Sequence, residues 1–113
     1  MRNGWNPRVI RDLLKGRAID TQYSMDSTKR LISGNPAFEF MYDFYLAQFY
    51  ILNDLWMKER YLVNRASLID RLRTMLESPM DPSEDACDPG RFTTYWELQI
   101  KALIDEFESL IYR

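Results

Sequence analysis

The chain of 113 residues contains no histidine, one cysteine and four glycines. Without histidine, its own residues cannot build a Ser-His-Asp or Cys-His nucleophile, a His-containing zinc site or the Glu-x-x-His ligand pairs of di-iron bundles. Four scattered glycines do not form a glycine-rich phosphate loop. We therefore expect a protein with no catalysis of its own, no metal and no cofactor.

The single cysteine, Cys87, cannot form a disulfide within the chain, so nothing here requires an oxidising compartment. Nearby acidic side chains oppose formation of a thiolate at this position. They are Asp81, Glu84, Asp85 and Asp88. The N-terminus is basic but has no apolar segment typical of a signal peptide, which favours a cytoplasmic protein.

The remaining composition is that of a globular domain. Hydrophobic residues make up 46% of the chain and charged residues 28%, with a net charge of −2. At this length a single domain, residues 1–113, can bury a sizeable core. Residues 37–57 are long enough to cross a bilayer, but they include Glu39, Asp43 and Asp54, and each acid costs about 2.5–3.5 kcal/mol at mid-bilayer. We expect no membrane association.

The first helix that the sequence predicts is short. Asn6 is placed as an N-cap, Pro7 stands at the first helical position, and Trp5 and Ile10 are spaced as a hydrophobic staple. Gly16 is where such a helix would stop. We expect a helix of about 10 residues that must dock on the rest of the chain, since it is too short to be stable alone. Residues 17–34 are polar and weakly periodic, which is typical of a connector with at most one turn of helix, around residues 27–33.

A long helix is predicted over residues 36–77. Alternating aromatics at its start resemble a strand, but polar residues recur at spacings of three and four, as on a helix. These residues include Glu39, Asp43 and Asp54, and we expect them to form a solvated face. No proline or glycine interrupts this stretch, and a break near Asn64 is left open.

Residues 78–92 hold three prolines, one glycine and four acids, which is typical of a linker. Thr94 and Glu97 are then spaced as a capping box. The apolar seam that follows has the spacing of a helix packed along another helix: Trp96, Ile100, Leu103, Phe107 and Leu110. The sequence thus predicts an all-α small bundle, in which the C-terminal amphipathic helix packs antiparallel to the central helix and the N-terminal helix lies across both.

Nine aromatic residues lie between positions 38 and 61, too many for the buried face of one amphipathic helix. Either the rest of the chain encloses the second flank, or a partner covers it. We favour an interface with a second copy or another protein, because aromatic residues are enriched at the centres of such contacts. The predicted interface residues are Phe40, Phe44, Ile51, Leu55 and Trp56. An adaptor or regulatory subunit that self-associates fits this pattern.

Charge is distributed unevenly along the chain. Residues 1–30 hold seven basic and three acidic side chains, whereas residues 78–113 hold three and eight. The basic residues near the N-terminus predict an alternative function, contact with nucleic-acid phosphates. They are Arg2, Arg8, Arg11, Lys15 and Arg17. A pI of about 5.1 argues against it, and the basic segment could instead pair with the acidic C-terminal helix.

Overall fold

Most of the chain that the structure describes is helical. The computed structural model describes residues 4–78, 80–81 and 84–109. Its helices are α1 (Pro7–Leu31), α2 (Phe38–Trp56), the 3-10 turn η1 (Glu59–Tyr61), α3 (Arg65–Glu77) and α4 (Pro89–Ser109). No β-strand occurs in those ranges. The predicted all-α class is confirmed.

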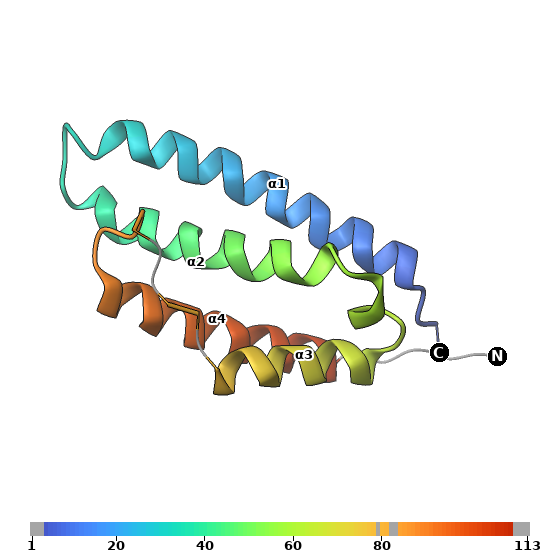
Figure 1. The fold of residues 1–113 in the computed structure, drawn as a ribbon. Coiled ribbons are helices and arrows are strands. Elements are labelled where there is room, and N and C mark those ends of the chain that lie inside the picture. The colour runs from blue at the N-terminus through green and yellow to red at the C-terminus, as the bar shows by residue number, and fades with distance from the viewer. Residues whose placement is uncertain (1–3, 79, 82–83, 110–113) are drawn as a thin grey trace.

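Successive α-helices run in alternating directions along the bundle (Figure 1). α1 packs along α2, α2 along α4, and α4 along α3, so that α2 lies between α1 and α4. α4 therefore runs antiparallel to α3, as predicted for the C-terminal helix, but parallel to α2. Within the described ranges, no helix combines the length and the apolar character needed to cross a membrane.

The first helix is much longer than predicted. Asn6 caps it as expected, since its side-chain oxygen accepts the N–H groups of Arg8 and Val9 at 3.0 and 3.3 Å. The helix then continues through Gly16 to Leu31. The prediction failed because the buried face of this second half consists of small and polar residues. They are Ala18, Thr21 and Thr28.

The two threonines pack against α2 without leaving a polar atom unsatisfied. Their hydroxyls donate to the carbonyls of Arg17 and Ser24, one turn earlier in the helix, at 2.7 Å each. Such internal bonding lets a threonine occupy an apolar contact surface. Because this buried face contains few large apolar residues, the sequence shows no apolar periodicity there. This explains why residues 17–34 resemble a connector.

The predicted central helix is divided in two. α2 begins at Phe38 and ends at Trp56, and α3 begins at Arg65 with Asn64 as its cap, which accepts the N–H of Ser67 at 2.8 Å. The break near Asn64 is confirmed, but residues 57–64 are not α-helical. They turn the chain back, which allows α3 to pack on α4.

Helix α4 starts earlier than predicted, at Pro89, so the connector ends at Asp88 rather than at residue 92. The Asp88 side chain accepts the N–H groups of Gly90 and Arg91 at 3.0 and 3.2 Å. Thr94, predicted to be the cap, lies inside the helix and donates to the Gly90 carbonyl. The Asp-Pro pair repeats the Asn-Pro start of α1, and we missed it inside an otherwise loop-like composition.

One apolar core joins these helices. Its fully buried members include Leu14, Ile51, Leu52, Leu55, Leu68, Leu72, Phe92, Ile100 and Phe107. The predicted seam of α4 is confirmed at Trp96, Ile100 and Phe107, whereas Leu103 is half-buried. Leu110 lies outside the described residues.

Gly16→Ala is expected to raise the free energy of unfolding by about 0.5–1 kcal/mol, because alanine loses less backbone entropy in a helix. A Cβ at this position would meet no atom within 4 Å, so no clash offsets the gain. Urea denaturation of the parent and the variant measures the difference. An unchanged or lowered stability would contradict a continuous α1.

Candidate protein-interaction site

The predicted interface residues of α2 differ in burial: two are buried, one is half-buried and two are exposed. Ile51 and Leu55 are 0% exposed and belong to the core, so they are not available to a partner. This corrects the prediction for both residues. Trp56 is half-buried: its indole N–H donates to Asn53 at 2.9 Å, and the Lys15 ammonium lies 5.2 Å from its ring centroid.

Phe40 and Phe44, in contrast, stay on the surface at 54% and 39% exposure. Met41, on the same half of α2, is 44% exposed, and Leu98 of α4 is 57% exposed. Tyr95, one turn before Leu98, contacts Phe44 edge to face with 5.5 Å between ring centroids. We call these five side chains, Phe40, Met41, Phe44, Tyr95 and Leu98, the aromatic patch.

Arg91 supports one end of this patch. Its guanidinium lies 3.9 Å from the centroid of the Phe40 ring, close enough for a cation–π interaction. The same guanidinium is paired with Asp43 at 3.5 Å and with Asp88 at 3.4 Å, and only 18% of the side chain is exposed. The position of the Phe40 ring is thus tied to a network of charged groups.

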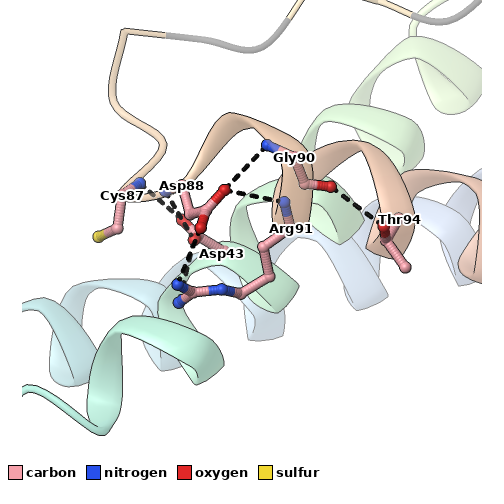
Figure 2. A network of polar contacts seen from close by, with 6 residues as sticks. All are labelled: Asp43, Cys87, Asp88, Gly90, Arg91 and Thr94. Carbon is pink, nitrogen blue, oxygen red and sulfur yellow. Dashed lines mark hydrogen bonds and ion pairs between the residues drawn. The ribbon is translucent and has the colours of Figure 1, made fainter.

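Asp43 is the centre of that network (Figure 2). Its carboxylate is 0% exposed and accepts the backbone N–H groups of Cys87 and Asp88 at 2.8 and 3.1 Å. Burial raises the pKa of Asp43 above its ordinary value, while the two N–H donors and Arg91 act in the opposite direction. Asp43 therefore fastens the connector before α4 to the first half of α2, and the solvated face predicted for this residue is wrong.

The pKa values of two groups beside Asp43 are shifted in opposite directions. Burial, followed by the charges of Asp43 and Glu39, raises the pKa of the exposed Cys87 thiol, which keeps it protonated near neutral pH. Asp88 is affected in the opposite way, since the backbone N–H of Arg91, followed by its charge, lowers the pKa of the Asp88 carboxyl. The two bonds from backbone N–H groups to Asp88 stabilise the start of α4.

A groove between α2 and α4 runs beside the patch and has a volume of about 230 Å³. Phe44, Gln48 and Ala102 line it, and the amide of Gln99 donates to the Phe44 carbonyl at 2.9 Å. Pockets for small-molecule ligands usually measure about 300–1,000 Å³, so this groove is too small for one. It has room for a side chain from a partner protein.

The five predicted nucleic-acid contacts do not form one basic surface. Arg2 lies outside the described residues, and Arg17 makes two hydrogen bonds to Glu106 of α4, at 3.0 and 2.7 Å. Lys15 covers Trp56. Arg8 and Arg11 remain near the start of α1, where Arg8 is exposed and Arg11 half-buried. Pairing between the basic segment and the acidic C-terminal helix, the intramolecular alternative, is confirmed for Arg17.

Sequence reasoning missed Asp43, Arg91, Tyr95 and Leu98 as parts of this site. Leu98 could have been predicted to be exposed, because it is a large apolar residue that lies outside the seam of α4. Among the residues that the structure describes, no group of three Cys, Asp or Glu side chains could hold a metal ion.

Asp43→Asn should lower the free energy of unfolding by about 1.5–3 kcal/mol, the range for hydrogen bonds to a charged group. The amide loses the charge that Arg91 faces, and its NH2 cannot accept one of the two backbone N–H groups. Asp81→Asn, in the exposed part of the connector, is the control and should change stability by less than about 0.5 kcal/mol. Equal effects of the two substitutions in urea denaturation would contradict this role of Asp43.

A pH-dependent contribution is expected from Arg17 and Glu106. The hydrogen bond from Arg17 lowers the pKa of Glu106 below its ordinary value of 4.5. The stabilisation is therefore present above that pH and is lost as the pH falls through the lower pKa of the folded state. Parent and Glu106→Gln should differ by at most about 1 kcal/mol at neutral pH, because the pair is partly solvated.

The difference between these two proteins should shrink on acidification in urea denaturation measured over a pH series. Asp105→Asn, at the exposed neighbouring position, is the control for removing one acid from α4 and should change stability by less than about 0.5 kcal/mol at neutral pH. A difference between parent and Glu106→Gln that stays constant into acid would contradict the assignment.

Comparison of the chain with protein-family models, with curated proteins and with solved structures gives no match. The arrangement of its own surface is thus the basis for a functional hypothesis. That basis is the aromatic patch, held in place by Arg91 and the buried Asp43.

Proposed function

We propose that the chain is a non-catalytic helical interaction module that self-associates through the aromatic patch and acts as an adaptor or regulatory subunit in the cytoplasm. The observation that carries this proposal is the exposure of Phe40, Met41 and Phe44 together at the start of α2. Single exposed apolar side chains are common, but adjacent ones on a small domain favour an interaction site.

The residue types in the patch support this proposal. Aromatic residues, methionine and arginine are enriched at the centres of protein interfaces, and a few such side chains usually provide most of the binding energy. Phe40, Phe44 and Tyr95 are rigid rings, so ordering them on binding costs little conformational entropy. Arg91 adds a guanidinium stacked on the Phe40 ring.

The rings of the aromatic patch are held in place by neighbouring side chains, which also favours binding of a partner. Phe40 contacts Arg91, which Asp43 holds, and Phe44 contacts Tyr95 of α4. A surface that is ordered before binding loses less entropy when the complex forms. The alternative function, contact with nucleic acid through the N-terminal segment, has less support, because Arg17 and Lys15 are engaged within the chain.

Phe44→Glu is expected to leave the monomer folded and to abolish self-association, because the new carboxylate can stay in water beside α2. Ile51→Glu should instead unfold the chain, since it places an unpaired charge in the core. Tyr23→Glu, at a 71% exposed position on α1, is the control for adding a charge to the surface. Circular dichroism reports the folding of each variant, and sedimentation equilibrium reports its mass.

Two outcomes would contradict the proposed function. One is a parent protein that remains monomeric at every concentration tested. The other is a Phe44→Glu variant that self-associates as strongly as the parent and the Tyr23→Glu control. Binding of random-sequence RNA or DNA with a steep dependence on salt would favour the nucleic-acid alternative.

A further inference from the structure

A second surface lies at the opposite end of the bundle. Near the start of α1 and the segment after α2 there is a depression of about 550 Å³. Its lining includes Pro7, Arg8, Arg11, Glu59, Leu62 and Val63. We call it the basic depression. It is larger than the groove of about 230 Å³ beside Phe44 and has room for an aromatic side chain.

The chemistry of the basic depression combines apolar surface with positive charge. Pro7 and the 58% exposed Val63 supply apolar surface. Arg8 and Arg11 have no acidic partner within the described part of the chain, although Glu59 lies on the same rim. The first backbone N–H groups of α1 are already bound by Asn6, so the helix end itself is not free to hold an anion.

The aromatic patch has the opposite charge at its rim. Glu39 directly precedes Phe40, and Asp88 lies beside the Arg91 that covers the Phe40 ring. Asp85 is exposed in the connector that Asp43 fastens to α2. Arg91 is neutralised by its two carboxylate partners. The basic residues Lys29 and Arg30 also lie at this end, in the last turn of α1.

These two surfaces cannot meet within one molecule. The start of α1 and residues 57–64 lie at one end of the bundle, and the starts of α2 and α4 lie at the other (Figure 1). The longest extent of the molecule is 54 Å. A contact between them therefore requires two copies of the chain.

We propose that copies associate head to tail: the acid-rimmed aromatic patch of one copy docks in the basic depression of the next, with Phe40 as the inserted side chain. The proposal rests on the proposed self-association and names the surface that the patch meets. Opposite charges at the two rims favour this pairing over contact between two acidic ends or two basic ends. Such an interface joins two different surfaces, so it adds copies in an open chain unless a ring closes.

Two variants, each defective in one surface, test the pairing. Phe40→Ser/Phe44→Glu removes the patch, and Arg8→Glu/Arg11→Glu reverses the charge of the depression. Each variant alone should be monomeric at concentrations where the parent forms a series of oligomers, with association weakened at least tenfold. An equimolar mixture should recover a dimer and nothing larger, because one intact patch and one intact depression remain.

Controls separate this contact from general effects. Lys29→Glu/Arg30→Glu makes the same change in net charge at the patch end and should associate at least as strongly as the parent, because it adds negative charge to the surface that meets the basic depression. The milder Arg8→Gln/Arg11→Gln should weaken association less, and added salt should weaken association of the parent. Circular dichroism confirms that each variant is folded, and sedimentation velocity measures the distribution of species.

The proposal is overturned if Arg8→Glu/Arg11→Glu associates like the parent, or if the equimolar mixture of the two defective variants stays monomeric. Loss of association in the patch variant alone would then leave the proposed function standing with a different partner surface. A parent protein that never associates would instead overturn the proposed function together with this inference.

Discussion

A buried carboxylate between two helices and a connector is the contact on which the other features depend. Complete burial of the Asp43 carboxylate has a desolvation cost. Two backbone N–H groups and Arg91 compensate for it by binding the carboxylate. Those N–H groups belong to Cys87 and Asp88, so the same contact determines where the connector ends. Asp88 then caps α4, whose seam completes the core through Trp96, Ile100 and Phe107. The position of α4 against α2 is therefore linked to one acidic side chain.

The aromatic patch is a consequence of that placement. With α4 fixed beside α2, Ile51 and Leu55 become core residues, while Phe40 and Phe44 extend past the contact and stay partly in water. Arg91 and Tyr95 support the two rings from α4. The chain keeps these apolar side chains on its surface even though burying them would stabilise it further. Burial of these side chains in a complex would recover the stabilisation that the monomer lacks. This is the basis of the proposed self-association.

Only some of the oppositely charged side chains pair with each other within the molecule. Arg17 pairs with Glu106 between α1 and α4, and Arg71 pairs with Asp54 between α3 and α2. The acidic connector and the arginines near the start of α1 lie at opposite ends of an elongated bundle and cannot neutralise each other. A head-to-tail contact between copies would bring these charges together. It would also cover the aromatic patch, so one contact would account for both features.

The all-α class, the N-cap of α1 and the seam of α4 follow from the sequence, because caps and apolar periodicity depend on residues a few positions apart. The sequence left the break near Asn64 open. The length of α1 does not follow from the sequence. Its second half is buried through Ala18, Thr21 and Thr28, and the two threonines bond to carbonyls of their own helix, so no apolar periodicity marks this face. Nor does the sequence distinguish Ile51 and Leu55 from Phe40 and Phe44, as all four lie on one flank of the same helix. The packing of α2 against the other helices decides which of them is buried. The position of α4 in that packing depends on contacts between residues more than 40 positions apart, such as Asp43 with Cys87 and Asp88.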